Sequence, residues 1–286
     1  MREKLTDLHC HSVYSDGTCT PEEIVNEAKR IGLSSVALTD HDAIDGIEEF
    51  HKAGKKHNIE TITGIELAAQ HNRFHREEIH IVGLGFDVNS VPLKRLMEQI
   101  AIDRDTRNHI IIEELNKHGY NITLEEVLQT SKNGVLMRSH FITLLLQKGY
   151  QESGEYLFDK FLSVNSRAFK EIDFASSQKI ISTVHEAGGV AVLAHPTLYN
   201  LTDSKIESLV SELKGYGLDG IEVEYTTYTP EQAEFITSLV NKYNLLYSGG
   251  SDFHGTYKPG VYLGIGKGNL KIPYSYWIAL KERCLC

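Results

Sequence analysis

The chain has few cysteines and no long apolar run. Its 286 residues include four cysteines, with neither a Cys-x-x-Cys pair nor the spacing of a disulfide framework. They are Cys10, Cys19, Cys284 and Cys286. This spacing disfavours a cysteine zinc site and fits a reducing compartment. No apolar stretch approaches the roughly 18 residues of a membrane span, and none follows a basic cluster near the start. We therefore expect a cytoplasmic protein with no membrane partner.

The chain also lacks an excess of positive charge. Lys and Arg number 29 against 39 Asp and Glu, which gives a formal net charge of -10. This balance argues against binding to long duplex nucleic acid, which needs a basic surface. A small anionic substrate is still compatible, because divalent ions in a cleft would reverse the local charge. With 41% apolar residues and no long polar tract, the chain is expected to bury a large core.

Two histidines, His9 and His11, stand one residue apart at the end of the first apolar run, and Asp16 follows closely. Alternate side chains of a strand share a face, so this pair can reach one metal ion from a single strand. Imidazole suits zinc, manganese and iron. Incidental surface histidines are the alternative for this pair taken alone.

Other ionisable residues lie at or just beyond the ends of short β-branched runs. They are His41, Glu66, His80, His195, Asp252 and His254. In a parallel α/β barrel the carboxyl ends of all strands open on one face, and that face carries the chemistry. The pattern therefore predicts that these side chains gather with the first two histidines at the mouth of a barrel.

Apolar runs alternate with helical patterns along most of the chain. Strands are predicted at 5–9, 35–38, 61–66, 79–86, 190–194, 220–224 and 245–248, and helices near 21–30, 45–56, 175–187, 203–214 and 230–243. Thr20, Pro21 and Glu23 predict a capped helix start, and Gly32 predicts its end. The alternation predicts an α/β fold with a parallel sheet, closed as a distorted seven-stranded TIM-like (β/α)7 barrel.

Residues 91–165 break this alternation. Leu93, Leu96, Met97 and Ile100 repeat with helical spacing, and further helical patterns cover 123–128, 139–147 and 155–162. We interpret 91–165 as an all-helical insertion that caps the active site, and 1–90 with 166–286 as the catalytic barrel. Insertions on this face of a barrel commonly select the substrate.

Within the insertion, Arg138, Ser139 and His140 stand where a helix begins. Free N–H groups and the helix dipole favour an anion there, and Arg138 could add a bidentate grip on phosphate. The alternative is an ordinary capped surface helix, which the sequence alone favours.

Some acidic residues are assigned supporting roles. Asp40, beside His41, would orient an imidazole or cap a helix. Glu222 and Glu224 stand two residues apart on the sixth strand, and we expect only one of them to face the barrel interior. A structural role is the default for both.

Together these motifs resemble the polymerase and histidinol phosphatase (PHP) superfamily of metal-dependent phosphoesterases. The resemblance runs from His9 to His254 and so spans almost the whole chain. Arg138-Ser139-His140 and the helical insertion are similar to the branch that hydrolyses nucleoside 3′,5′-bisphosphates and trims short RNA from its 5′ end. That branch usually has proline at the position of Ser139, a departure that bears on the substrate and leaves the metal site untouched.

The resemblance implies two to three divalent ions, Mn, Zn or Fe, with Mg possible, and nine ligands in three groups. The groups are His9, His11, Glu66 and Asp252; Glu66 again, as a bridge, with His80 and His195; and Asp16, His41 and His254. Many relatives carry histidine where this chain has Asp16. An oxygen ligand there favours manganese or magnesium over zinc.

The implied function is hydrolysis of the 3′-phosphate of nucleoside 3′,5′-bisphosphates, of the pAp to AMP type, with trimming of short 5′-phosphorylated oligonucleotides. The ions and Arg138 would neutralise charge on the phosphoryl oxygens. His140 would bind phosphate or donate a proton to the leaving oxygen, and both roles stay open. Arg167 and Lys170 could grip the second phosphate, with solvated surface as the alternative.

Other function classes compete with this one. A similar barrel could serve a histidinol-phosphate-type small-molecule phosphatase or a metal-dependent amidohydrolase, which also begins with His-x-His and uses a late Asp. Amidohydrolases do not normally carry a cluster like Asp16, His41 and His254, so the cluster favours a phosphoesterase. A non-catalytic module should have lost ligands, whereas all nine positions are filled. The oligomeric state is unknown from the sequence.

Overall fold

The computed structural model describes residues 3–71, 77–132, 135–163, 166–167 and 174–284. Eight strands form one sheet in the order β7-β6-β5-β4-β3-β2-β1-β8. They are β1 (Leu5–Asp7), β2 (Ser35–Leu38), β3 (Glu60–His71), β4 (Glu77–Leu84), β5 (Val190–Leu193), β6 (Gly220–Tyr225), β7 (Leu246–Gly250) and β8 (Ile272–Pro273). The α/β class predicted from the sequence is confirmed.

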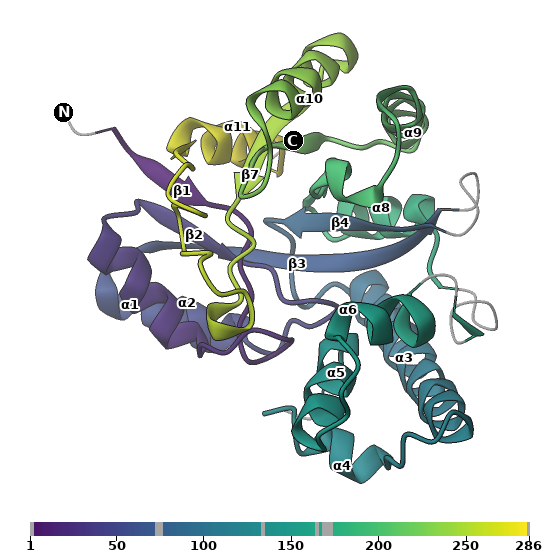
Figure 1. The fold of residues 1–286 in the computed structure, drawn as a ribbon. Coiled ribbons are helices and arrows are strands. Elements are labelled where there is room, and N and C mark those ends of the chain that lie inside the picture. The colour runs from purple at the N-terminus through teal and green to yellow at the C-terminus, as the bar shows by residue number, and fades with distance from the viewer. Residues whose placement is uncertain (1–2, 72–76, 133–134, 164–165, 168–173, 285–286) are drawn as a thin grey trace.

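Helices surround this sheet (Figure 1). The α-helices are α1 (Pro21–Ile31), α2 (Ile47–His57), α3 (Val91–Lys117), α4 (Leu124–Leu128), α5 (Arg138–Gln147), α6 (Gly154–Leu157), α8 (Ser177–Glu186), α9 (Asp203–Gly215), α10 (Pro230–Tyr243) and α11 (Tyr274–Cys284). A π-helical segment, η2 (Phe158–Leu162), follows α6, and η3 (Pro196–Tyr199) and η4 (Gly255–Tyr257) are short 3-10 helices. No helix in the described ranges is both long and apolar enough to cross a membrane.

The local signals at α1 act as the sequence predicts. The Thr20 hydroxyl accepts the N–H of Glu23, and the Glu23 carboxylate accepts the N–H of Thr20. The helix ends at Gly32, whose φ of 85° is readily adopted only without a side chain. These contacts satisfy the free backbone groups at both ends of α1, so its ends are set locally.

The sheet differs from the predicted parallel barrel in strand number and direction. It has eight strands rather than seven, and β4 pairs antiparallel with both β3 and β5. Only residues 72–76 separate β3 from β4, which is too short for the crossover of a dozen or more residues that a parallel pair needs. The extra strand β8 has two residues and pairs antiparallel with β1. Two residues are too few to show the alternating pattern from which a strand is predicted.

The sheet is nearly closed, because the chain after β1 meets the end of β7. The N–H of Leu8 donates to the carbonyl of Gly249 at 3.2 Å, and the N–H of Asp252 donates to the carbonyl of His9 at 2.8 Å. A Cβ on Gly250 would lie only 2.1 Å from the Cβ of His9. The close approach of these two segments therefore requires glycine at 250.

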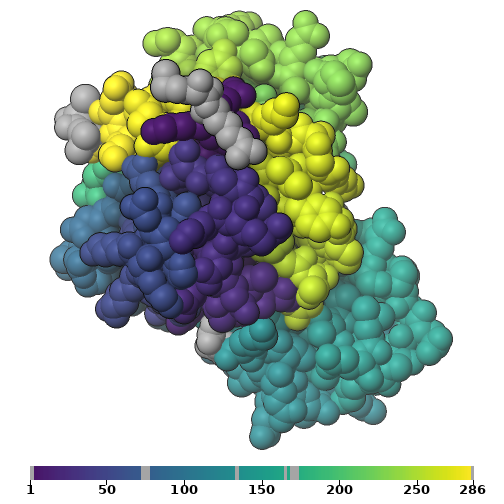
Figure 2. All heavy atoms as spheres, turned by 90° about the vertical axis from the view of Figure 1, so that its left-hand side faces the viewer, coloured from purple at the N-terminus to yellow at the C-terminus, as the bar shows by residue number. Residues whose placement is uncertain are grey.

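The helices from α3 to η2 have a hydrophobic cluster of their own, which includes Ile111, Phe141 and Phe161. The first turns of α3 belong instead to the core of the sheet, where Leu93 is buried. Thus α3 joins the two cores. In Figure 2 the teal region formed by these helices stands out from the body of the molecule.

Candidate metal centre and its cavity

The first group of predicted ligands comes together where the segments after β1 and β7 meet the middle of β3. The Nε2 atoms of His9 and His11 lie 3.0 Å apart. Oε2 of Glu66 lies 3.1 Å and 3.2 Å from these two nitrogens, and Oδ1 of Asp252 lies 3.7 Å and 3.2 Å from them. Nitrogen ligands of a tetrahedral zinc ion lie about 3.3 Å apart, from bond lengths of about 2.0–2.1 Å. The four side chains are therefore spaced to hold one ion.

Glu66 connects this group to a second one. Its other oxygen, Oε1, lies 2.7 Å from Nδ1 of His80 and 2.9 Å from Nε2 of His195. Nδ1 of His41 approaches the first oxygen, Oε2, at 3.0 Å. One buried carboxylate thus presents each oxygen to a different set of imidazoles, which is the arrangement a bridging ligand requires.

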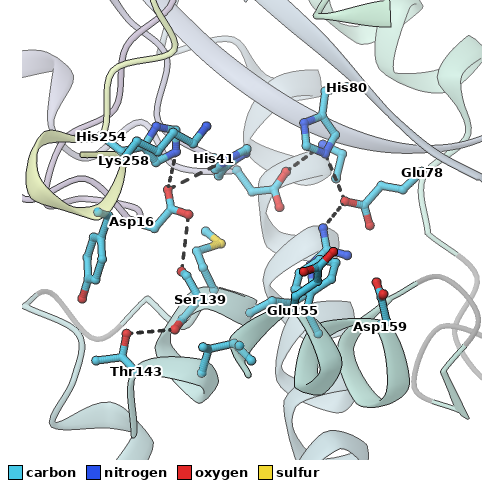
Figure 3. A pocket seen from close by; sticks show the side chains of 18 of the residues that line it. Asp16, His41, Glu78, His80, Ser139, Thr143, Glu155, Asp159, His254 and Lys258 are labelled. Atoms are coloured by element: carbon cyan, nitrogen blue, oxygen red, sulfur yellow. Dashed lines mark hydrogen bonds and ion pairs between the residues drawn. The ribbon is translucent and has the colours of Figure 1, made fainter. Parts of the chain in front are cut away.

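The third group surrounds Asp16. Its Oδ1 lies 3.2 Å from Nε2 of His254 and 4.0 Å from Nε2 of His41, and His11 is near enough to share the same ion. All nine sequence-predicted ligand residues therefore lie in one cluster, and Figure 3 shows Asp16, His41, His80 and His254 around the cavity.

Unsatisfied atoms in this cluster fit a cation. Oε2 of Glu66 and Oδ1 of Asp16 are buried and accept no hydrogen bond from the described residues. Nδ1 of His195 is also buried and forms no hydrogen bond with the described residues. A buried carboxylate oxygen that lacks a donor is costly unless a cation pairs with it. The mixed nitrogen and oxygen donor set suits zinc, manganese or iron.

The charges of the cluster are strongly coupled. Burial alone would raise the pKa of Glu66, but nearby imidazoles, His41 foremost, outweigh burial and hold that pKa well below its usual range. Burial of Asp16 is likewise outweighed by His254, and its pKa also lies well below normal. Burial opposes a charged His80, yet Glu66 raises the pKa of His80 to about 10. Carboxylates that stay ionised among buried imidazoles attract cations.

Two of the predicted ligands adopt a strained backbone. The backbone φ is 29° at His195 and 54° at Asp252. Asp42, the residue after His41, has a φ of 45°. Such conformations cost of order 1–3 kcal/mol each for residues with a side chain, and they concentrate at functional sites. Here they aim the carboxylate and imidazole into the cluster.

Glu222 supports the cluster from β6, and it is the member of the Glu222/Glu224 pair that faces inward. Its Oε1 accepts Nδ1–H of His9 at 2.7 Å, and its Oε2 accepts the backbone N–H of His195 at 2.7 Å. The first bond leaves Nε2 of His9 free for a metal. The sequence alone does not separate the two glutamates, because they are distinguished by a register shift between them in the pairing of β6 with β7.

Asp252 is fixed on the side away from the histidines. Its Oδ2 accepts the hydroxyl of Tyr225 at 2.5 Å and Nζ of Lys258 at 2.6 Å. Oδ1 of Asp252 therefore stays available to the cluster of predicted metal ligands. Neither Tyr225 nor Lys258 was anticipated, because nothing in their local sequence signals a contact with Asp252.

Asp40 supports a loop rather than an imidazole directly. Its carboxylate accepts the N–H and hydroxyl of Ser12 and the hydroxyl of Ser15, at 2.6–2.7 Å. These bonds shape the segment between His11 and Asp16, so Asp40 positions two predicted ligands through the backbone that carries them.

A cavity of about 650 Å³ opens beside the cluster. Asp16, His41, His80 and His254 line one side of it, and residues of α5, α6 and η2 line the other (Figure 3). The lining also carries three cationic side chains from three separate segments. They are Arg107, Arg138 and Lys258.

Arg138 lines this cavity, where Glu78 pairs with it. Glu78 also lies 3.0 Å from Nε2 of His80, so one carboxylate links the arginine to a predicted metal ligand. Glu78 stands two residues before His80 on β4, a spacing that places both side chains on one face and was a usable sequence signal.

His140 is 3% exposed, and its Nδ1 accepts the N–H of Met137 at 2.9 Å at the start of α5. Its neighbour Ser139 donates to Oδ2 of Asp16 at 3.4 Å. Arg167 pairs with Glu113 and Glu114 of α3. Lys170 lies outside the described residues.

Comparison with known proteins identifies the family. A family model described as the PHP domain matches residues 7–189. A 5′-3′ exoribonuclease from Haemophilus influenzae is 34% identical over 251 residues, which cover 88% of this chain and 90% of that protein. A 3′,5′-nucleoside bisphosphate phosphatase from Chromobacterium violaceum is 29% identical over 280 residues, 98% of this chain and 97% of that protein.

The fold agrees with these relationships. A solved structure from Bifidobacterium adolescentis, assigned as a metal-dependent phosphoesterase, matches this fold with a TM-score of 0.84 at 28% sequence identity. The match covers 98% of this chain and 96% of the Bifidobacterium chain. The fold and the cluster define a metal-dependent phosphoester hydrolase. The chain belongs to the PHP family.

Proposed function

We propose that this enzyme removes the 3′-phosphate from nucleoside 3′,5′-bisphosphates, as in pAp to AMP, and trims short 5′-phosphorylated oligonucleotides. The observation that carries the proposal is the shared cavity, in which the cluster of predicted metal ligands faces Arg138 and Lys258. A phosphate ester fits between metal ions and such cations because its negative charge is balanced from both sides. The named activities of the Haemophilus and Chromobacterium relatives support this substrate class.

We further propose that the nine clustered residues hold two to three divalent ions, with Glu66 as the bridge. When bound, these ions would activate water and stabilise the charge that develops on the phosphoryl oxygens. The spacing of the imidazoles about Glu66 and its unsatisfied Oε2 support this assignment. The carboxylate of Asp16 in the third group favours manganese or magnesium there.

In the proposed reaction, the chain's own residues bind and orient the phosphate. Arg138 binds the equatorial oxygens from the start of α5, and Glu78 holds its guanidinium toward His80 in the absence of substrate. Nδ1 of His140 accepts the N–H of Met137, so Nε2 is the atom that we propose for a contact with the substrate, although His140 is 3% exposed and is not among the described residues that line the cavity. Either phosphate binding or proton donation to the leaving oxygen is compatible with that contact.

We propose that residues 91–165 act as a capping unit on a barrel formed by 1–90 and 166–286. The wall of the cavity opposite the metal cluster comes from α5, α6 and η2, and Ser139 reaches across to Asp16. A unit that supplies one wall of the cavity selects which leaving group fits.

A phosphate-release screen tests the proposal. Metal-loaded enzyme would be compared on 3′-phosphoadenosine 5′-phosphate, histidinol phosphate and 5′-phosphorylated RNA oligomers, with chelated enzyme as the blank. We expect the highest kcat/KM on the bisphosphate and measurable release of nucleotides from short RNA. Preference for histidinol phosphate would refute the nucleotide assignment while leaving the phosphoesterase class intact.

A further inference from the structure

Asp42 directly follows the predicted ligand His41 and has a strained backbone. Its φ of 45° lies in the left-handed region, which residues with a side chain adopt mainly where surrounding contacts hold them. The N–H of Asp42 donates to the carbonyl of Glu66 at 2.9 Å, and Oδ1 of Asp42 accepts the N–H of Ala68 at 3.3 Å. These two contacts tie the segment to β3.

Arg104, from α3, supplies further contacts to Asp42. Its Nη2 donates to the backbone carbonyl of Asp42 at 3.1 Å and lies 3.0 Å from Oδ2 of the carboxylate. The two side chains are each 11% exposed, so water competes little for these contacts. Removing one member of a buried ion pair leaves the other charge uncompensated. Without Arg104, the carboxylate of Asp42 would be free to turn into the cavity that Asp42 lines.

Arg104 reaches the cluster through Asp42. Among the described residues, Asp42 lines the cavity beside the cluster and Arg104 does not. Ser139 of α5 makes a second contact of this kind, because its hydroxyl donates to Oδ2 of the predicted ligand Asp16 at 3.4 Å (Figure 3). The helical segment 91–165 therefore contacts two of the stretches that carry the third group of ligands. The first group receives its supporting contacts from β6 and from the loop after β7.

The third group tolerates little movement of His41. Nε2 of His41 lies 4.0 Å from Oδ1 of Asp16, whereas Nε2 of His254 lies 3.2 Å from the same oxygen. Two ligands of one ion can be at most about 4.2 Å apart, which is twice a bond length of about 2.1 Å. A small displacement of His41 away from Asp16 would therefore prevent the two side chains from sharing an ion.

We propose that Arg104 is a positioning residue for the third predicted metal group. By binding two oxygens of Asp42, it keeps His41 close enough to Asp16 for both to hold one ion. The inference rests on the proposed function and deepens it, because the segment that supplies one wall of the cavity then also sets the occupancy of the third ion.

Manganese titration of the metal-free protein tests the proposal. Electron paramagnetic resonance measures free Mn²⁺, which gives the number of bound ions and the affinity of each. We expect three ions in the wild type, and in Arg104→Gln a third ion bound about 10- to 100-fold more weakly, the usual effect of removing a residue that supports a ligand. The other two affinities should stay within about twofold of the wild-type values, because those ions share no contact with Arg104. Arg95→Gln, at an exposed position of the same helix, is the matched control and should change none of them.

A double-mutant cycle separates positioning from a general loss of stability. Asp42→Asn removes the charge that pairs with Arg104 and keeps the backbone conformation accessible, because asparagine tolerates a positive φ. If Arg104 acts through Asp42, the double variant should bind the third ion about as weakly as the weaker single variant. Losses that multiply, or equal weakening of all three ions, would overturn the proposal. If Arg104→Gln does not fold, Asp42→Asn alone carries the comparison, and unchanged binding of all three ions would then count against the positioning role.

The two proposals can fail separately. If the wild type releases phosphate from none of the nucleotide substrates, the proposed function is wrong, while selective weakening of the third ion in Arg104→Gln would still support the positioning role. If the wild type hydrolyses these substrates but binds fewer than three Mn²⁺ ions, or if Arg104→Gln binds all three as the wild type does, the positioning role is wrong and the function stands.

Discussion

The carboxylate of Glu222 offers a sharp test of how the barrel positions the proposed metal ligands. It is 1% exposed, and each of its oxygens accepts one buried N–H, Nδ1–H of His9 and the backbone N–H of His195. Glu222→Gln keeps the shape of the side chain but replaces one oxygen with an NH₂ group. One of the two buried donors then faces another donor.

The size of the effect follows from that loss. A buried donor without an acceptor costs about 1–3 kcal/mol, which would lower the free energy of unfolding by that amount. Loss of the carboxylate that orients a metal-binding imidazole typically weakens metal affinity about 10- to 100-fold, or about 1.4–2.7 kcal/mol. The first loss should appear in the free energy of unfolding and the second in the affinity for metal, which we expect to fall by at least about tenfold.

The assay is competition for Mn²⁺ against a fluorescent chelator, with urea unfolding of the metal-free protein in parallel. Glu224→Gln is the matched control, because Glu224 lies two residues further along β6, beyond a register shift in the pairing with β7, and is half-buried. It should bind Mn²⁺ as the wild type does. Wild-type affinity in Glu222→Gln would refute the view that this carboxylate sets the orientation of His9.

Further predictions concern phosphate binding, packing and pH. Arg138→Ala should lower kcat/KM for the preferred phosphoester roughly tenfold or more, and an unchanged value would mean that Arg138 serves only to pair with Glu78. Gly250→Ala should lower the free energy of unfolding by about 1–3 kcal/mol in urea titrations, because the added Cβ would meet His9. Gly215→Ala is the control and should not destabilise the fold, because a Cβ there would meet no other atom within 4 Å. Burial would raise the pKa of Asp219, but hydrogen bonds from His185 and Ala191 outweigh it and hold the folded-state pKa below normal. This carboxylate therefore stabilises the fold above about pH 4 and loses that contribution as the pH falls through its folded pKa. Asp219→Asn should lower the free energy of unfolding by about 1–2 kcal/mol at pH 7. If urea unfolding shows the same difference between wild type and variant at pH 3, this assignment is contradicted.

Local signals predicted the elements whose ends depend on their own residues. The capping contacts of Thr20 and Glu23 place α1 correctly, and the predicted bounds of α10 match the structure. The predicted ligands gather as expected, although only some of them follow strand ends. Glu66 and His80 lie inside β3 and β4, and Asp16 lies in the loop after β1. The direction of β4 was missed because the predicted strands at 61–66 and 79–86 left residues 67–78 between them, whereas in the structure both strands extend into that stretch and only 72–76 separate them.

The supporting contacts depend on tertiary packing and leave weaker traces in the sequence. Lys258 reaches Asp252 from four residues beyond His254, in a loop without a periodic pattern. The pairs of Arg104 with Asp42 and of Arg138 with Glu78 become visible only in the folded chain. The two arginine pairings join residues 62 and 60 positions apart in the chain, so no local spacing predicts them.

The central claim is that one carboxylate, Glu66, bridges a cluster of divalent ions, and metal content measures this most directly. Protein purified from cells supplied with manganese should contain about two to three metal equivalents per chain by elemental mass spectrometry, from the number of available ligands. Glu66→Ala should stay folded and lose at least one equivalent together with phosphoesterase activity. Less than one equivalent in the wild type, or full metal content in Glu66→Ala, would contradict the bridged site.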